Sequence, residues 1–469
     1  MTGYRRGFDS LQREVADAPL TVRGDLPDWL AGTLVRNGPA VFDHAGKSLR
    51  HWFDGQAMLH AFAIADGDVR YTNRLLDTPS LRSLRDRGRI GFGEFATDPC
   101  GSLFGRFFSR FNRRPSANAC VNITAVGAEP AAVSEVPLAV TFDPKTLETL
   151  GVTDYSAGVA GAVTTAHPHA LPDTGDLVNY VLKFGRRSEY AFYRRSTNDS
   201  AGTVVGRYVT EKPGYVHSFA VTRRYVVLAV FPLVVNPLSF LLRGRPFIEN
   251  YAWKPEDGLR IVVLDAAGGG IVAEHTAPAA FAFHHVNAYE DGDSVVMDLA
   301  AFDDADIVQA LYLGALRGGE PVPMARPVRY TVPLGPGEVG VRRLADVPFE
   351  LPRIHYGRHN GRPYRYAYGV GAADPAGTNF LDQLVKLDVH TGRTVVWRPD
   401  GGYPGEPVFV PAPTARGEDD GVVLSVVLDV VRGASSLVVL DAEQFTEVAR
   451  ADVPHAIPFG FHGQFAGGS

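Results

Sequence analysis

A hairpin that recurs at long, nearly regular intervals is the feature that most narrows the folds open to this chain. Four stretches each contain an apolar strand ending in Asp, a turn and a second β-branched strand: VTFDPKTLETLG, VVLDAAGGGIVAE, VKLDVHTGRTVVW and VVLDAEQFTEVAR. Their turn aspartates, at positions 143, 265, 388 and 441, are 122, 123 and 53 residues apart. These intervals approximate two, two and one units of about 60 residues, a spacing typical of the radial repeats of a β-propeller.

Length and composition agree with this architecture. Dividing 469 residues by such a unit gives seven or eight blades, and seven once insertions are subtracted. The 50 Gly and 33 Pro favour a turn-rich, all-β chain. Residues 302–319 have helical spacing, and 230–253 are too apolar for an ordinary surface loop, so both are predicted insertions. Residues 51–74 predict three strands joined by turns. We expect one domain over residues 1–469.

Charge and cysteine usage exclude several classes of protein. The net charge of −6 gives no reason to expect a nucleic-acid partner. Cys100 and Cys120 are too few for a disulfide framework, which suits a reducing compartment. The N-terminal stretch lacks an apolar signal core, and no apolar run is long enough to span a bilayer. These features predict a cytoplasmic protein, peripherally attached to membranes at most, with no obligate protein partner.

Four histidines lie in apolar, strand-like stretches where a core would ordinarily place Val, Ile or Phe: His167, His217, His284 and His462. A single such histidine is usually a core or surface residue, but several in similar settings need a common reason. Neutral imidazole is the commonest metal ligand, and four of them leave the charge of a divalent ion uncompensated. Acidic residues should therefore surround the ligands. Three glutamates in similar stretches are candidates: Glu135, Glu350 and Glu406.

The motifs resemble those of the carotenoid cleavage oxygenase family over nearly the whole chain. They include, in order, LVRNGPAVFD, HWFDGQAMLHAF, FDPKTLETLG, AHPH, YVHSFAVT, FHHVNAYE, GEPVFVP and the terminal FHGQF. The resemblance implies a seven-bladed β-propeller with a loop and short-helix cap over an axis that carries Fe²⁺. It implies that the four histidines above bind the iron, that the three glutamates support them, and that His169 and His285 are spare.

The resemblance also implies a dioxygenase that cuts a carotenoid double bond with O₂. We expect β-carotene, cut at the central bond to give retinal. Stilbene-cleaving relatives carry Lys immediately before the glutamate that matches Glu135, whereas this chain has Ser134, which cannot supply an ammonium to a phenolate. Two alternatives remain open: eccentric or apocarotenoid cleavage, and a non-cleaving retinoid isomerase or binding protein on the same scaffold.

A membrane surface is the further expected partner. The apolar stretch FPLVVNPLSFLL is followed by Arg243 and Arg245, and apolar residues flanked by cations suit an interfacial anchor. Residues 231–245 are therefore predicted to contact a membrane, with the Arg- and Phe-rich residues 104–114 as a second contact. The alternative is that this stretch packs on the protein itself.

Overall fold

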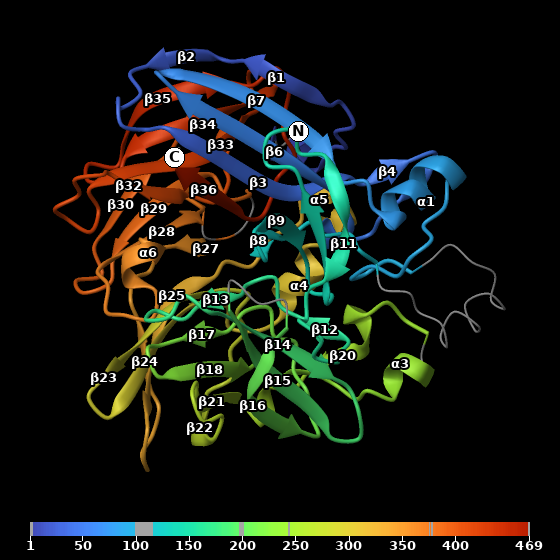
Figure 1. Cartoon of the computed structure of the whole chain (residues 1–469), viewed down its shortest axis with the longest axis vertical. Helices are drawn as coiled ribbons and strands as arrows, with labels where there is room; N and C mark the ends of the chain where they lie inside the picture. Colours follow the sequence, from blue (N-terminus) through green and yellow to red (C-terminus); the bar gives the residue numbers. More distant parts are fainter. Residues whose placement is uncertain are drawn as a thin grey trace.

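Seven β-sheets are arranged in a ring in this computed structural model, which describes residues 3–98, 116–196, 201–242, 244–374, 376 and 379–467 (Figure 1). The predicted seven-bladed, all-β propeller is therefore confirmed. Blade 1 has the order β1 (Val15–Pro19), β7 (Asp68–Leu75), β6 (Gln56–Ala65), β3 (Gly32–Val41) and β36 (Gly463–Gly467). Blade 2 has the order β11 (Thr149–Asp154), β10 (Leu138–Phe142), β9 (Glu129–Val133) and β8 (Asn122–Val126).

The next three blades follow along the chain. Blade 3 contains β12 (Val163–Thr164), β14 (Leu177–Lys183), β15 (Ser188–Arg195) and β16 (Thr203–Thr210), with β13 (His169–Ala170) also paired to β14. Blade 4 contains β17 (Ala220–Val221), β18 (Tyr225–Val230), β21 (Leu259–Asp265) and β22 (Ile271–Ala277). Blade 5 contains β23 (His285–Asp291), β24 (Ser294–Ala301), β25 (Arg326–Pro333) and β26 (Gly340–Arg343).

The last two blades complete the ring. Blade 6 contains β27 (Glu350–Arg353), β28 (Tyr366–Gly371), β29 (Gln383–Asp388) and β30 (Thr394–Trp397). Blade 7 contains β2 (Thr21–Gly24), β35 (Thr446–Asp452), β34 (Ala434–Asp441), β33 (Gly421–Asp429) and β31 (Gly402–Pro404), with β32 (Val408–Pro411) also paired to β33. The pairings β2–β35 and β3–β36 join the beginning of the chain to its end, and so close the ring.

The recurring aspartates explain the spacing seen in the sequence. Each lies at the turn between the last two strands of a blade, in blades 2, 4, 6 and 7. Asp143 Oδ1 accepts the backbone amides of Lys145 and Thr146 at 2.9 and 2.8 Å. The Oδ1 atoms of Asp265, Asp388 and Asp441 also accept turn amides. Because Asp caps its own turn, the motif is local and visible in sequence, and the intervals are two, two and one blades, as predicted.

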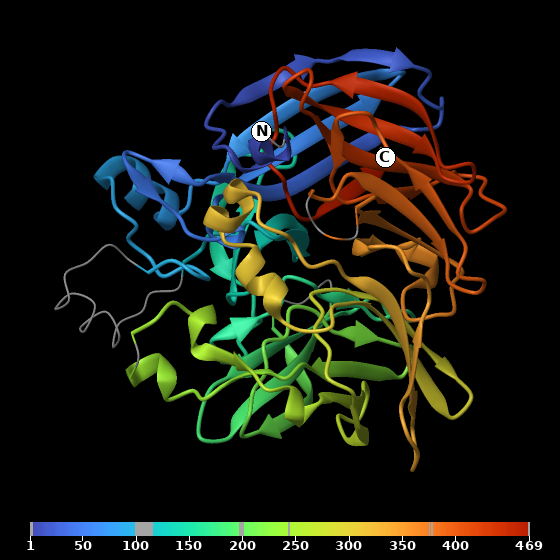
Figure 2. The same ribbon diagram turned by 180° about the vertical axis from the view of Figure 1, so that it is seen from behind.

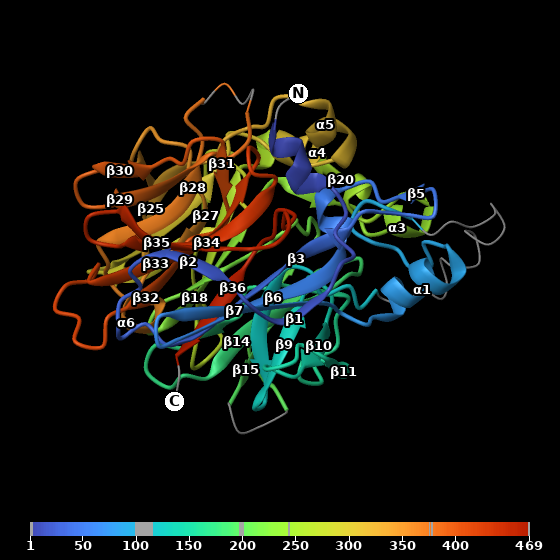
Figure 3. The same ribbon diagram turned by 90° about the horizontal axis from the view of Figure 1, so that it is seen from above.

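Short helices and loops cover one face of the ring (Figure 2). They include η1 (Gly3–Phe8), α4 (Asp306–Ala310) and α5 (Leu313–Gly318), whereas α6 (Tyr356–His359) lies on the opposite face (Figure 3). The other short helices are η2 (Trp52–Asp54), α1 (Pro79–Arg87), α3 (Ser239–Leu242), η3 (Ile248–Asn250) and η4 (Pro255–Asp257). Small sheets β4 (Asp43–His44) with β5 (Lys47–Ser48), and β19 (Leu233–Val235) with β20 (Tyr251–Trp253), complete the structure.

The two predicted insertions lie within blades. Residues 302–319 form α4 and α5, which confirms their helical spacing, and 230–253 leave blade 4 between β18 and β21. The strand predicted at the start of 51–74 is wrong: His51 caps the 3₁₀ turn η2, because its side chain accepts the Phe53 amide while Asp54 accepts the amide of His51. Within the described ranges, no helix is long and apolar enough to cross a bilayer.

Candidate metal centre

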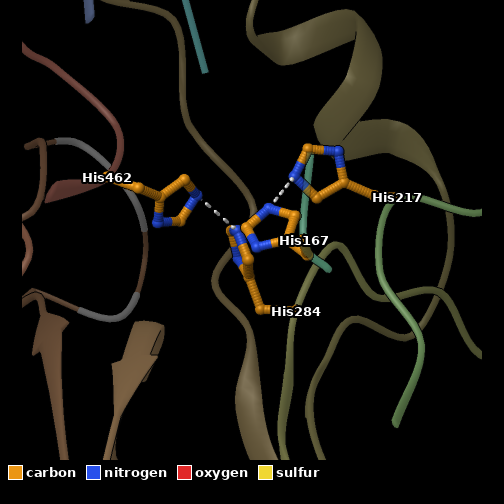
Figure 4. Close-up of side chains that lie close together, drawn as sticks. All are labelled: His167, His217, His284 and His462. Atoms are coloured by element: carbon orange, nitrogen blue, oxygen red, sulfur yellow. Dashed lines mark hydrogen bonds between the residues drawn. The ribbon is translucent and has the colours of Figure 1, made fainter. Parts of the chain in front are cut away.

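The side chains of His167, His217, His284 and His462 lie close together (Figure 4). Their ligand nitrogens all lie within 4.8 Å of one another. The Nε2 atoms form two close pairs, 3.1 Å apart between His167 and His217 and 3.2 Å apart between His284 and His462. The histidines lie just before β13, β17, β23 and β36, so they come from blades 3, 4, 5 and 1. The ring therefore brings together residues that are far apart in sequence.

Hydrogen bonds between neighbouring blades hold the backbone at these histidines. The Thr165 hydroxyl donates to the carbonyl of His217 and accepts the amide of His167 at 3.0 Å, which links blade 3 to blade 4. The amide of His462 donates to the carbonyl of Val121 at 3.2 Å, which links blade 1 to blade 2. Movement of one blade would therefore displace a ligand, and the centre is fixed by the closed ring.

The three predicted glutamates each accept a hydrogen bond from a histidine: His217 Nδ1 donates to Glu135 at 2.6 Å, His284 Nδ1 to Glu350 at 2.6 Å and His462 Nδ1 to Glu406 at 2.7 Å. Glu135 lies in the loop before β10, Glu350 begins β27, and Glu406 lies between β31 and β32. Blades 2, 6 and 7 thus supply the glutamates, and blades 1, 3, 4 and 5 the histidines. Each of the seven blades contributes one residue to the cluster.

These hydrogen bonds determine what the centre can bind. A histidine that donates through Nδ1 to a carboxylate presents an unprotonated Nε2. The Nε2 lone pairs of these three histidines then lie within 4.8 Å of one another, and those of His284 and His462 are 3.2 Å apart with no proton between them. A cation satisfies such a set of converging lone pairs, and neutral imidazole suits Fe, Zn, Cu and Ni. The residues present therefore fit a divalent metal, and three carboxylates nearby offset its charge.

Burial keeps the imidazoles in the state that binds metal. Burial, and then the neighbouring histidines, lower the pKa of His167 well below its ordinary value. Burial lowers the pKa of His462 to about 4, against the opposing effect of Glu406. Both rings are therefore neutral at physiological pH, and their nitrogen lone pairs are available without competition from protons.

Glu406 differs from the other two glutamates because arginines contact it. Its Oε2 accepts hydrogen bonds from Arg36 Nη1 and, at 2.9 Å, from the amide of Gly463. Arg353 Nη1 lies 3.6 Å from its other oxygen. Burial alone would raise the pKa of Glu406, but Arg353, His462 and Arg36 outweigh burial and lower it to about 2. This carboxylate therefore stays charged beside His462.

An apolar cavity adjoins the cluster and encloses about 720 Å³ of empty space, including the part open to solvent. His217, His284 and His462 line it, together with Glu350. The remainder of the lining is apolar and rich in aromatic rings: Trp52, Phe53, Phe283, Phe302, Phe349, Phe380 and Phe461. An apolar, aromatic lining of this kind suits a hydrocarbon ligand beside the Nε2 atoms of the cluster.

Two further histidines of the same motifs point elsewhere. The ring nitrogen Nε2 of His169 donates to the carbonyl of Phe219 at 2.9 Å, and its Nδ1 contacts the hydroxyl of Tyr356. His285 Nδ1 contacts the hydroxyl of Ser218 at 2.8 Å. Neither belongs to the metal-binding group found among the described residues. Their hydrogen bonds hold the loops beside the centre.

Three residues of the site had no role predicted from the sequence: Arg36, Arg353 and Tyr215, whose hydroxyl donates to Glu135 at 2.6 Å. Arg36 lies in LVRNGPAVFD, one of the motifs that carry the family resemblance, and that position was the available signal. Phe283 and Phe461 line the cavity and directly precede His284 and His462. An aromatic residue immediately before a ligand was a second, unused signal.

Comparison with known proteins places these features in a family. A family model described as "Retinal pigment epithelial membrane protein" matches residues 8–467. The chain is 34% identical to a mitochondrial carotenoid-cleaving dioxygenase of Macaca fascicularis, with 95% of this chain and 91% of the relative covered. It is also 34% identical to a carotenoid isomerooxygenase of Galleria mellonella, with 97% and 95% covered.

Solved structures agree over the whole length. The chain superposes on a cobalt-substituted Synechocystis ACO with a TM-score of 0.90 at 27% identity, covering 99% of this chain and 98% of the other. A mutant of Synechocystis apocarotenoid oxygenase gives a TM-score of 0.88 at 26% identity, with the same shares covered. With the four-histidine centre and the apolar cavity beside it, these matches show that the chain belongs to the carotenoid cleavage oxygenase family, which includes the retinal pigment epithelial membrane protein.

Proposed function

We propose that this protein is an Fe²⁺-dependent dioxygenase that cleaves a carbon–carbon double bond of a carotenoid. The observation that carries the proposal is the position of the four-histidine centre at the wall of an apolar, aromatic-lined cavity. Three of the four proposed iron ligands face this cavity, so a bound hydrocarbon would lie next to the metal. His167, His217, His284 and His462 would hold the iron, with Glu135, Glu350 and Glu406 supporting three of them.

Iron held by four neutral nitrogens would supply redox chemistry toward O₂. Both oxygen atoms are accounted for if one is added to each carbon of the double bond, which yields two carbonyl products. The chain itself performs the other tasks. The aromatic walls orient the polyene and exclude water, which protects reactive intermediates from hydrolysis. The reaction requires no general acid or base.

The substrate we propose is β-carotene, cut at its central bond to give retinal. Apart from Glu350 and the three histidines, the lining side chains offer no charged, hydroxyl or amide group, which suits an unfunctionalised hydrocarbon. Ser134 precedes Glu135 where an ammonium would be needed to bind a phenolate, which disfavours stilbenes. Apocarotenoid or eccentric cleavage, and retinoid isomerisation without cleavage, are the competing activities that a test must separate.

One incubation distinguishes these activities. Iron-loaded protein is supplied with O₂ and, separately, with β-carotene, an apocarotenal, a stilbene and a retinyl ester, and the products are identified by chromatography and mass. We expect retinal as the sole aldehyde from β-carotene. Long apocarotenals without retinal would move the cut off centre. Isomerised retinoid without any cleavage, or stilbene turnover alone, would contradict the proposal.

A matched pair of variants tests the ligands. His284→Ala removes an Nε2 from the centre, and we expect it to lose bound iron and activity. His285→Ala removes the neighbouring ring, which contacts Ser218 instead, and should retain both. Iron content by elemental analysis checks the first result without relying on turnover. Full occupancy in His284→Ala would contradict the assignment.

We also propose peripheral attachment to membranes through part of residues 231–245. Leu238, Leu241 and Leu242 are 60, 54 and 75% exposed on and beside α3, so they present an apolar surface. Phe231 and Leu233 are buried. This part of the stretch therefore packs on the protein itself, which the alternative interpretation expected for the whole stretch. Exposed leucines next to Arg245 suit insertion at the headgroup boundary. The other predicted contact, 104–114, lies outside the described residues.

Liposome flotation tests this attachment with a matched control. In phosphatidylcholine vesicles, wild type should float, and Leu238→Ser, Leu241→Ser and Leu242→Ser combined should not. The control changes three exposed valines on the outer strands of blades 5 and 6 to Ser: Val341, Val395 and Val396. This control should float like wild type. Equal flotation of all three proteins would contradict the proposal.

A further inference from the structure

The N-terminal helix η1 is buried against the cap instead of lying free on the surface. Within this helix, Gly3–Phe8, the side chains of Tyr4 and Phe8 are 1 and 0% exposed. The helix lies beside α5, outside the seven blades (Figures 2 and 3). It therefore adds two large aromatic side chains to the interior next to the cavity without belonging to any sheet.

Three hydrogen bonds from distant parts of the chain fix the position of η1. Arg317 Nη2 donates to the carbonyl of Phe8 at 2.7 Å, and Arg5 Nη2 donates to the carbonyl of Gly318 at 2.8 Å. The amide of Phe459 donates to the carbonyl of Gly7 at 2.8 Å. A Cβ at Gly7 would lie 2.1 Å from the Phe459 ring, so only glycine permits this approach. The helix is thus held against both α5 and the segment that leads to His462.

The rings of η1 stand behind one wall of the cavity. Trp52 and Phe380 line the cavity on this side. Phe380 contacts four rings, with centroids at 5.7 Å for Tyr4, 5.4 Å for Phe8, 5.8 Å for Trp52 and 4.9 Å for Phe459. Phe8 also packs edge-on against Trp52 at 5.6 Å. Two of the five rings therefore come from η1, and without them Phe380 would lose half of its aromatic neighbours.

The chemistry of the lining makes the position of this wall important. A hydrocarbon polyene has no polar group to bind, and the Trp52 N–H is already used, because it donates to the carbonyl of Phe459 at 3.0 Å. A rod-like substrate in an apolar slot can slide along its length. Its register relative to the metal must then be set by where the cavity ends. A wall that blocks the chain decides which double bond lies beside the centre.

We propose that η1 is a stopper for the substrate cavity: Tyr4 and Phe8 hold Phe380 and Trp52 in place, and so limit the length of polyene that fits beyond the metal. This inference rests on the proposed function, because it concerns which bond of a polyene is cut. It assigns the choice of bond to a segment that carries no ligand and lines no part of the metal centre. Tyr4 and Phe8 are specificity-determining residues that act through their neighbours.

Phe8→Ala and Phe380→Ala are the variants that test the stopper. Each removes a ring from the wall, which should let a chain slide further. The control is Phe62→Ala, which removes an equally buried ring that packs on Tyr71 in a separate core. All three should lower the melting temperature. With β-carotene, the ratio of off-centre to central products should rise about 10-fold or more in the wall variants, the discrimination typical of apolar pockets, and stay unchanged in Phe62→Ala.

A binding measurement separates failure of the stopper from failure of the proposed function. Quenching of tryptophan fluorescence in metal-free protein reports the affinity for apocarotenals of graded length. Wild type should bind chains up to a limit and then lose affinity, and Phe8→Leu, which keeps an apolar side chain and so preserves folding, should move that limit to longer chains. Affinity that does not fall with length in wild type, or an identical limit in folded Phe8→Leu, overturns the stopper. If the protein shows this dependence of affinity on chain length but no turnover, the proposed dioxygenase activity is wrong and the proposed role of η1 is retained.

Discussion

Glu406 and Glu350 receive the same hydrogen bond from a histidine Nδ1, yet their surroundings differ. Both oxygens of Glu406 have partners, which include two arginines and the amide of Gly463. Glu350 Oε2 accepts His284 and its neighbouring amide, and its Oε1 has no hydrogen-bond partner among the described residues. One carboxylate is part of a buried ion network, and the other lines the apolar cavity.

The difference shows that the same hydrogen bond from a histidine to a glutamate can play two roles, one in stabilising the fold and one in binding a metal. At Glu406, Arg36 also donates to the carbonyl of Phe461 at 2.9 Å, so the network fixes the segment that carries His462 just before β36. The charge of Glu406 is largely balanced before any metal binds. No cation contacts Glu350 among the described residues, so its charge would be available to His284 and to a metal bound there. We therefore expect the contacts of Glu406 to affect mainly the free energy of unfolding, and the contacts of Glu350 to affect mainly the affinity for a metal ion.

Removing one partner of the buried ion pair should have the largest effect. Arg36 and Glu406 have side chains 6 and 0% exposed, so Arg36→Met leaves a buried carboxylate short of a cation. We expect the free energy of unfolding of metal-free protein to fall by about 3–5 kcal/mol, as for other broken buried pairs. Urea unfolding measures it. The control Glu350→Gln should cost about 1 kcal/mol, and Arg36→Met with Glu406→Gln should recover part of the loss; equal losses would refute the contrast.

For metal affinity we expect the opposite order: a change at Glu350 should have a larger effect than a change at Glu406. A carboxylate that accepts a ligand's Nδ1–H raises the basicity of that ligand, and its loss costs about 10–100-fold in affinity. Because the arginines already offset the charge of Glu406, we expect Glu350→Gln near the upper end of this range and Glu406→Gln near the lower. Titration of folded metal-free proteins with Co²⁺, followed by its visible absorption, gives both constants. A larger loss in Glu406→Gln would break the comparison.

A third carboxylate, the half-buried Glu94, extends this comparison, because no cation contacts it among the residues that the structure describes. Burial raises the pKa of Glu94 to about 8, although the hydroxyls of Ser80 and Ser116 donate to it. The folded protein then holds a proton that the unfolded chain releases near pH 4.5, so stability should fall as pH rises from 4.5 to 8, by at most about 1.4 kcal/mol per pH unit. Glu94→Gln should flatten this slope in urea unfolding. The contribution of Glu406, with a pKa lowered to about 2, is lost only as pH falls from 4.5 toward 2.

The parts of this molecule that sequence predicts are those with local causes. The aspartate of each outer hairpin caps its own turn, so the blade period is visible without a structure. The seven residues predicted for the site could be named from the sequence because each stands in a short motif that could be recognised separately, whereas it is the ring of blades that brings them together. The role of these residues as metal ligands and supports stays a prediction.

The contacts that could not be predicted from the sequence form only when the ring of blades closes. Arg36 and Glu406 are 370 residues apart and meet only when β3 pairs with β36. The same closure brings Phe459 against η1. Neither contact is marked in the sequence by a repeated spacing or by a local motif. The burial of Leu233, in a stretch predicted to face a membrane, likewise follows from the pairing of β19 with β20.

The smallest expected effect concerns Arg353, the second arginine beside Glu406. Its Nη1 lies 3.6 Å from Glu406 Oε1, which is too far for a direct hydrogen bond, and its side chain is 21% exposed, against 6% for Arg36. Water screens a charge in that position, so Arg353→Met should lower the free energy of unfolding by only about 0.2–1 kcal/mol. Urea unfolding beside Arg36→Met makes the comparison, and Arg353→Lys, which keeps the charge, should restore most of the loss. If Arg353→Met instead matched Arg36→Met, the two arginines would act as one unit, and the charge balance of Glu406 would depend on the cavity-side strand β27 as much as on β3.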